Sequence, residues 1–294
     1  MTEERPRPDG YEGLFRGSAR LGVLCAGLGV PWESVAPVVG SFSERFKDYF
    51  ELSIDPAKSA LGLMTKGEGQ PYVYRVTRLM EESGVPEAGL RRFLVRAKYF
   101  EARNVFFKVE ADSRGLREFS TYFRRRPSID VAHACLADAG ADADGVGLME
   151  AVAEVLEKKT VHFLGTAATP AGDLMEKVYF SQEGGAQSWE RLRAAAMLCG
   201  LSDSDWAPMA ARASALSDCT VFASLGYRNG ELMPGMKLDV HRVEPGIVNG
   251  LLSSDAERER ADLARVSSGN KRHSYVGFRL VPDAPVQIKT YNLG

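Results

Sequence analysis

The sequence has no run of about 18 apolar residues, so no segment is long enough to form a transmembrane helix. Its first six residues (MTEERP) are polar and lack the apolar core of a signal peptide. Its 4 cysteines lie far apart and form no C-x-x-C pair, which argues against a zinc site or a disulfide framework. We therefore expect a cytoplasmic protein with free thiols and no membrane partner.

A surplus of positive charge is also missing. Lys and Arg total 37 against 39 Asp and Glu, which gives a formal net charge of −2. Nucleic-acid-binding proteins need basic residues for phosphate contacts, so we expect no nucleic-acid partner. Hydrophobic residues make up 45% of the sequence and charged residues 26%, values typical of a globular protein. Closed barrels often reach 294 residues as one domain, and we expect a single domain over residues 1–294.

The sequence does contain a repeated order of elements, in which helical stretches are followed by two strands, five times over. The expected helices span residues 11–28 and 32–48, 86–98, 129–139 and 148–157, 188–199 and 205–215, and 247–252 and 256–266. The expected strands span residues 49–55 and 72–78, 105–111 and 117–125, 160–166 and 174–181, 220–227 and 233–242, and 273–281 and 285–292.

Short turns at residues 112–115 and 228–230 join strands as hairpins, which makes neighbouring strands antiparallel. A sheet of ten strands leaves exposed edges unless it closes, and helices between the hairpins can cover only one of its faces. We therefore predict an α+β fold: a closed ten-stranded antiparallel β-barrel of five ααββ repeats, with the helices outside and a ligand site in the lumen. An open or split sheet is the structural alternative.

Polar side chains recur on one face of these strands, because successive residues of a strand point to opposite faces. Strand by strand, this face carries Glu51; Arg75; Glu118, Ser120, Tyr122 and Arg124; Lys177 and Tyr179; Lys237, Asp239 and His241; and Gln287, Lys289 and Tyr291. For any single strand a solvent-facing surface explains the pattern, but recurrence in successive repeats favours a shared lumen. Unpaired buried cations are costly, so the lumen should hold an anion or water, and lysines with tyrosine hydroxyls suit a diphosphate.

The five-fold order of elements resembles the ABBA (PT-barrel) family of aromatic prenyltransferases over nearly the whole chain. The stretches that carry the resemblance are residues 50–53 (FELS), 74–76 (YRV), 176–180 (EKVYF) and 287–291 (QIKTY). The resemblance implies transfer of an allylic prenyl group, dimethylallyl or geranyl, from its diphosphate to an electron-rich aromatic acceptor of the indole or phenol type. The reaction would be an electrophilic aromatic substitution, and the partners would be the allylic diphosphate and a small aromatic acceptor.

The resemblance also implies a role for each of these residues. The diphosphate would be bound by Arg75, Lys177, Lys237 and Lys289, and the allylic cation shielded by Tyr122, Tyr179 and Tyr291. Glu51 would hold the acceptor N–H or O–H and take its proton. Further lumen candidates are His162, Gln287, Asp239, Arg124 and Glu118. With these cations around the diphosphate, Mg²⁺ is not expected to be required, and we expect no metal.

The sequence departs from the family at two points. Glu118 and Ser120 stand where the second hairpin usually supplies a lysine, for which Arg124 could compensate. Asp239 stands where the fourth hairpin usually supplies a tyrosine. These departures leave open a barrel that binds a small anionic or aromatic ligand without chemistry, and an open sheet used for protein interaction is a third possibility.

Simpler interpretations also exist for individual residues. Glu51 and Arg75 could form an ion pair that only stabilises the barrel. His162 could be a packed core histidine, and Asp239 with His241 could form a hydrogen-bonded pair as readily as a metal site.

Overall fold

The computed structural model describes residues 18–46, 49–267 and 271–293. The polar N-terminal segment and the first part of the helix expected from residue 11 lie outside the described residues. The helices are α2 (Ser18–Leu28), α3 (Trp32–Phe46), α4 (Gly69–Glu82), α5 (Glu87–Tyr99), α6 (Ile129–Asp138), α7 (Ala143–Val155), α8 (Ala186–Leu198), α9 (Asp203–Ala210), α10 (Ala213–Leu216), α11 (Pro245–Asn249) and α12 (Asp255–Ser267). The strands are β1 (Phe50–Asp55), β2 (Ala60–Gly67), β3 (Val105–Asp112), β4 (Gly115–Phe123), β5 (Phe163–Ala168), β6 (Leu174–Gln182), β7 (Val221–Arg228), β8 (Glu231–Leu232), β9 (Met236–Val243), β10 (His273–Leu280) and β11 (Gln287–Leu293).

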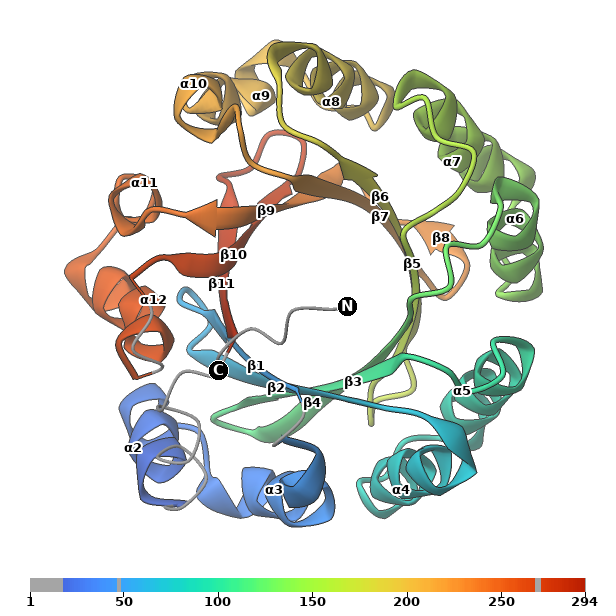
Figure 1. Ribbon diagram of the computed structural model, residues 1–294, viewed down its shortest axis with the longest axis vertical. Coiled ribbons are helices and arrows are strands. Elements are labelled where there is room, and N and C mark those ends of the chain that lie inside the picture. Colours follow the sequence, from blue (N-terminus) through green and yellow to red (C-terminus); the bar gives the residue numbers. More distant parts are fainter. Residues whose placement is uncertain (1–17, 47–48, 268–270, 294) are drawn as a thin grey trace, which may run out of the picture.

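The strands form a closed antiparallel barrel, surrounded by the helices (Figure 1). Hydrogen bonding runs from β1 through β6, from β6 to β7, and on through β9, β10 and β11. The barrel closes where β11 pairs with β1, with Ser53 opposite Tyr291. The two-residue strand β8 pairs with β7, outside the ten-stranded ring. This closure confirms the predicted barrel, and it rules out the open or split sheet and the protein-interaction surface based on it.

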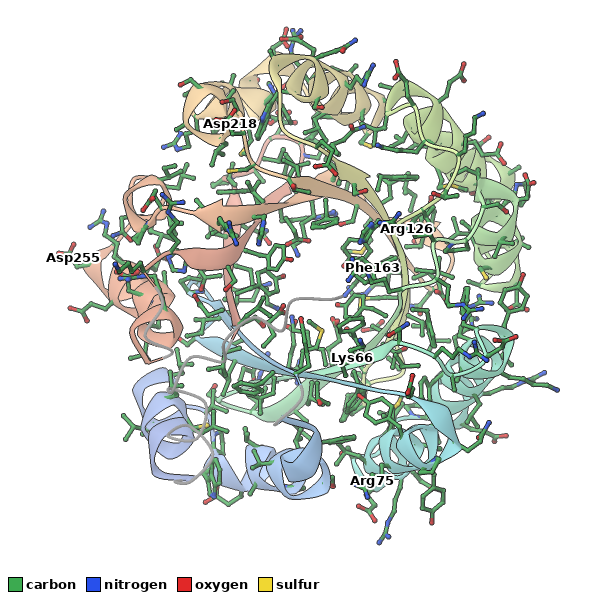
Figure 2. All side chains as sticks on the ribbon, viewed as in Figure 1. Lys66, Arg75, Arg126, Phe163, Asp218 and Asp255 are labelled. Atoms are coloured by element: carbon green, nitrogen blue, oxygen red, sulfur yellow. The ribbon has the colours of Figure 1, made fainter. Side chains whose placement is uncertain are left out.

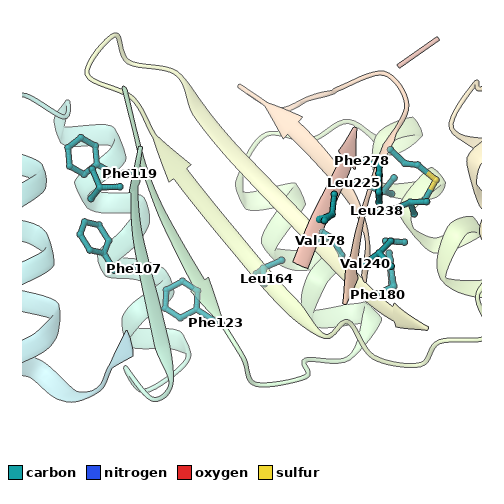
Figure 3. Packing of buried hydrophobic residues seen from close by; sticks show 14 of the residues in the cluster. Phe107, Phe119, Phe123, Leu164, Val178, Phe180, Leu225, Leu238, Val240 and Phe278 are labelled. Carbon is teal, nitrogen blue, oxygen red and sulfur yellow. The ribbon is translucent and has the colours of Figure 1, made fainter. Parts of the chain in front are cut away.

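The outer face of the barrel forms the hydrophobic core with the helices. Figure 3 shows part of it, including Phe107, Phe119, Val178, Leu238 and Phe278, each no more than 1% exposed. Burial of one such side chain contributes about 1.5–3 kcal/mol, so this layer dominates the stability of the fold. Since strand residues alternate, the polar residues between these positions point into the lumen.

The strand expected at residues 72–78 is wrong, because this segment belongs to helix α4. The buried residues of α4 follow the 3.6-residue period of a helix face and are Tyr72, Val73, Val76, Leu79 and Met80. Pro71 lies in the first turn of α4, where backbone N–H groups have no partner within the helix, so a proline costs no helical hydrogen bond.

The second strand of the first hairpin is instead β2, in the Gly-rich stretch that precedes α4. Leu61 and Leu63 of β2 are buried on the outer face. The inward positions are Gly62, Met64 and Lys66, whose partners across β3 are Glu110, Lys108 and Phe106. The first hairpin therefore presents a different set of residues to the lumen than the sequence pattern predicts.

Among the described helices, none combines the length and the apolar character needed to cross a bilayer.

Candidate active site in the barrel lumen

A pocket with a volume of about 150 Å³ lies in the lumen, with walls that are mostly aromatic. Eight of the residues expected there from the sequence line it, namely Glu51, Tyr122, Arg124, His162, Tyr179, Lys237, Asp239 and Tyr291. The pocket therefore brings together the acid, the tyrosines and one of the lysines that the alternation placed on a common face.

Lys177 and Glu118 form an ion pair on the inner face, with 2.8 Å between Nζ of Lys177 and Oε1 of Glu118. Glu118 also accepts a hydrogen bond from the hydroxyl of Ser120. Burial on its own raises the pKa of Glu118, but Lys177 and Ser120 outweigh burial and hold that pKa below its usual value. Burial lowers the pKa of Lys177, and Glu118 more than reverses this, so both groups remain charged at neutral pH.

Lys237 is held by two residues of the pocket wall. Its Nζ lies 2.6 Å from Oδ1 of Asp239 and donates a hydrogen bond of 2.7 Å to the hydroxyl of Tyr291. Asp239 replaces the tyrosine expected at this position of the fourth hairpin, and here it provides the lysine with a counter-ion.

Glu110 on β3 binds two lysines at once. Its Oε1 lies 2.8 Å from Nζ of Lys108 and also accepts a hydrogen bond from Lys289. Burial raises the pKa of Glu110, but the two lysines hold it well below its usual value. Burial also lowers the pKa of Lys289 to about 8, with a contribution from nearby Lys108. Lys108, Lys177, Lys237 and Lys289 therefore each pair with a carboxylate of the barrel, whereas the sequence pattern alone suggested an anion or water.

Three tyrosine rings lie beside these charged groups. Nζ of Lys237 lies 4.9 Å and Nζ of Lys108 5.1 Å from the ring centre of Tyr291. The rings of Tyr122 and Tyr179 meet edge to face, with their centres 5.8 Å apart. Burial raises the pKa of both Tyr179 and Tyr291 well above its usual value, so these phenols stay neutral. Neutral aromatic faces next to cations are suited to surround a positively charged group.

Glu51 lies on the pocket wall with 5% of its surface exposed. It lies opposite Met64 of β2, which is also part of the wall. The hydroxyl of Tyr49 donates a hydrogen bond to Oε2 of Glu51 over 3.3 Å. Burial raises the pKa of Glu51 to about 7, although the charge of Lys108 opposes this rise. A carboxyl group with this pKa can both take and release a proton at neutral pH.

Aromatic rings and one arginine gather at residues near the end of β4 and the starts of β5 and β7. The ring of His162 lies 4.8 Å from that of Phe222, and Cζ of Arg124 lies 5.7 Å from the ring centre of Phe163. Burial lowers the pKa of His162 to about 4, with Arg124 and Arg126 contributing, so His162 is neutral at physiological pH. His162 is thus both packed in the aromatic cluster and part of the pocket wall.

The placement of Arg75 in the lumen is wrong. Arg75 lies on α4, on the outer side of the helix ring (Figure 2), and its guanidinium donates a hydrogen bond of 3.4 Å to the backbone oxygen of Ser41. The same finding excludes the alternative Glu51–Arg75 ion pair. The physical reason is the helical period of residues 72–80, which the β-branched and aromatic residues of this segment obscure.

Lys108 is the main lumen residue that the sequence reasoning missed. It lies opposite Ser120 in the β3–β4 register and is 3% exposed. The second hairpin therefore does supply a lysine, from its first strand rather than its second. The alternation of Phe106, Lys108 and Glu110 on β3 was the available signal.

Arg279 of β10 is a second missed residue. It lies between Lys237 and Gln287 in the strand register, and its guanidinium donates a hydrogen bond of 2.6 Å to the backbone oxygen of Pro234. Gln287, at the start of β11, is exposed. Lys237, Arg279 and Gln287 thus share the inner face at the hairpin end of the barrel.

Within the described ranges, no group of three or more His, Cys, Asp or Glu side chains is arranged to hold a metal ion. His241, which shares a face with Asp239, packs its ring against Tyr275 with 4.8 Å between the centres.

Comparison of the sequence with family profiles and with curated proteins gives no match. Solved structures, in contrast, match over almost the entire chain. NotF prenyltransferase is 11% identical with a TM-score of 0.69, and the match covers 99% of this chain and 96% of NotF. The 5-dimethylallyltryptophan synthase from Streptomyces coelicolor is 13% identical with a TM-score of 0.62, covering 95% of this chain and 96% of the synthase.

A third match is PriB, whose crystal structure is a ternary complex with L-tryptophan and dimethylallyl thiolodiphosphate. It is 13% identical with a TM-score of 0.63, and the match covers 95% of both chains. At these identities the likeness concerns the fold. The chain therefore has the PT-barrel fold of the ABBA-type aromatic prenyltransferases, as the resemblance implied.

Proposed function

We propose that the protein is an aromatic prenyltransferase, which transfers a dimethylallyl or geranyl group from its diphosphate to an indole-type or phenol-type acceptor. The observation that carries this proposal is the convergence of Lys108, Lys177, Lys237 and Lys289 with tyrosine rings and the buried Glu51 inside one closed barrel.

The lysines would bind the diphosphate of the donor. Lysine ammonium groups form strong charge-assisted hydrogen bonds with phosphate oxygens, and they stabilise the charge that develops on the leaving group. Lys177, Lys237 and Lys289 retain the role expected from the sequence. Lys108 takes the place of Arg75, and Arg279 and Gln287 are candidates to contact the diphosphate from the hairpin end of the barrel.

Tyr122, Tyr179 and Tyr291 would surround the allylic cation. Their ring faces favour a cation, and the burial of Tyr179 and Tyr291 helps keep water from capturing it. Tyr291 also lies between two lysines, Lys108 and Lys237, which would place the leaving diphosphate beside the cation it has just released.

Glu51 would accept a hydrogen bond from the acceptor N–H or O–H and take its proton. Its pKa of about 7 leaves a large ionised fraction at neutral pH, as a general base needs. The acceptor ring would lie among the aromatic residues of the pocket wall, such as Phe106, Phe163 and Tyr275.

The structural neighbours support an indole acceptor. Two of them are named for dimethylallyltryptophan or were crystallised with L-tryptophan, together with dimethylallyl donor analogues. We extend this acceptor and donor class to the present chain as part of the proposal. That Mg²⁺ is not required, that residues 1–294 form one domain and that the protein is cytoplasmic stay predictions.

The test is an acceptor screen with dimethylallyl and geranyl diphosphates, in which products are identified by mass spectrometry and diphosphate release is measured in parallel. A prenylated aromatic product together with diphosphate release supports the proposal. Tight binding of donor or acceptor with no product across the screen contradicts it and favours a barrel that binds a small ligand without chemistry.

A further inference from the structure

Seven charged groups of the lumen are paired with one another. Four lysines, Lys108, Lys177, Lys237 and Lys289, pair with three carboxylates, Glu110, Glu118 and Asp239. Counting full charges, the set carries 4 − 3 = +1. These ion pairs therefore offer a diphosphate one unit of positive charge that a resident carboxylate does not already balance.

The carboxylates already contact the lysine ammonium groups that are proposed to bind the phosphate oxygens. Glu118 lies 2.8 Å from Nζ of Lys177, and Asp239 lies 2.6 Å from Nζ of Lys237. A lysine ammonium has three N–H donors. A donor of a buried lysine that already contacts a carboxylate is not available to a second anion in the same place. A diphosphate must therefore either share each lysine with a carboxylate or displace it.

Like charges at close range make sharing unfavourable. A carboxylate and a diphosphate on the same ammonium would lie within a few ångströms of each other in a water-poor site, where repulsion is strong. Glu118 and Glu110 also lie directly opposite each other in the β3–β4 register, so negative charge is already concentrated there.

We infer that Glu110, Glu118 and Asp239 are resident counter-ions of the lysines, which compete with the diphosphate of the donor and set its affinity. This inference rests on the proposed function and adds a role for these three residues in setting donor affinity. The barrel keeps its lysines paired when it is empty, which avoids the cost of unpaired buried charge. In return, part of the interaction energy with the diphosphate is used to break the resident ion pairs.

The experiment measures the affinity for inorganic diphosphate by titration calorimetry, in the presence of EDTA. Glu118→Gln and Asp239→Asn remove one negative charge each and keep the shape and hydrogen-bonding capacity of the side chain. Each is expected to tighten binding about tenfold, the equivalent of one charge-assisted hydrogen bond no longer broken. The use of two sites keeps the test valid if one variant does not fold.

Two control variants match these changes outside the lumen. Glu176→Gln replaces a buried carboxylate on the outer face of β6, where it pairs with Arg92 over 2.9 Å. Glu82→Gln replaces an exposed carboxylate of α4 paired with Arg78. Neither change is expected to alter diphosphate affinity.

Folded Glu118→Gln and Asp239→Asn proteins that bind diphosphate no tighter than the wild type overturn the inference. So does a second titration, with Mg²⁺ in place of EDTA, in which Mg²⁺ raises the diphosphate affinity of the wild type but not of the variants, because the acids would then be metal ligands. Failure of the wild type and of every variant to bind diphosphate overturns both the inference and the proposed function. Tightened binding in a protein that forms no prenylated product leaves the inference standing and removes the proposed function.

Discussion

The hydroxyl of Tyr49 donates a hydrogen bond to the carboxyl group of Glu51, 3.3 Å away, inside the barrel. This contact and the charge of Lys108 favour the ionised form of Glu51, but burial outweighs them and raises its pKa to about 7. The carboxyl group is thus held near the midpoint of its titration at physiological pH. This property separates a base for the acceptor proton from a carboxylate that only stabilises the fold.

Glu51→Gln is expected to lower turnover by about a hundredfold or more, because the amide keeps the shape and hydrogen bonding but cannot take a proton. The measurement is the steady-state rate of prenylated product at saturating donor and acceptor. Donor affinity should be nearly unchanged, because the lysines that bind the diphosphate are not altered. Near-normal turnover of a folded Glu51→Gln protein contradicts the role of base.

The pKa of Glu51 also predicts how stability depends on pH. The folded state raises this pKa from 4.5 to about 7, so between these values the folded protein binds more protons than the unfolded chain. The contribution of Glu51 to the free energy of unfolding therefore falls as pH rises from about 4.5 to 7, by at most about 3 kcal/mol.

Urea unfolding of the wild type and Glu51→Gln at pH 5 and pH 8 measures this contribution. The free energy of unfolding of the variant minus that of the wild type should be larger at pH 8 than at pH 5. An equal difference at both values shows that Glu51 titrates normally in the folded state. All other groups are common to the two proteins, so their titration cancels in the comparison.

The periodic spacing of apolar residues in the sequence predicted much of the fold and part of the site. Alternation placed Lys177 and Tyr179 on the lumen face of β6 because Val178 and Phe180 between and beside them are unmistakably apolar. The same reasoning failed for β2, where the inward positions begin with Gly62, which has no side chain to reveal the pattern. Residues 72–78 have a stronger strand signal than β2 and were therefore predicted as the second strand of this hairpin, although they form a helix.

The pairing of lysines with carboxylates could not be predicted in the same way. Glu110 contacts Lys289, which lies 179 positions away along the chain and three strands away around the barrel. Such contacts depend on the closure of the barrel and on the stagger between strands, and neither is encoded in any single strand. The charges of the lumen were therefore visible in the sequence, but their partners were not.

Lys177→Met should weaken the binding of inorganic diphosphate roughly 10- to 100-fold, because it removes a charged contact to the anion. Arg75→Met is the matched control, since Arg75 has the same charge but lies on the outer side of α4. Titration calorimetry of both variants separates the two positions. A loss of affinity in Arg75→Met equal to that in Lys177→Met contradicts the site described here.

Catalysis is expected to continue when divalent metals are removed. The ammonium groups of Lys108, Lys177, Lys237 and Lys289 can stabilise the leaving diphosphate directly, as a metal ion does in other enzymes. The measurement is product formation after treatment with EDTA, with and without added Mg²⁺. Weak stimulation by Mg²⁺ is compatible with this prediction, whereas activity abolished by EDTA and restored by Mg²⁺ contradicts it.

Gly62→Ala should destabilise the protein and disturb the lysine cluster, because Lys108 uses the space left by the missing side chain of Gly62. A methyl group there would lie 2.7 Å from Cε of Lys108 and would also overlap Oγ of Ser53. We expect a loss of about 1–3 kcal/mol in the free energy of unfolding, typical of overpacking, and weaker diphosphate binding because Lys108 must move away from Glu110. Gly22→Ala in α2 is the control, since no described residue has an atom within 4 Å of the added methyl group. Alanine there should stabilise the helix by about 0.5–1 kcal/mol. Urea unfolding and calorimetry of both variants test this pair, and an unchanged stability and affinity in Gly62→Ala shows that Lys108 does not depend on the space above Gly62.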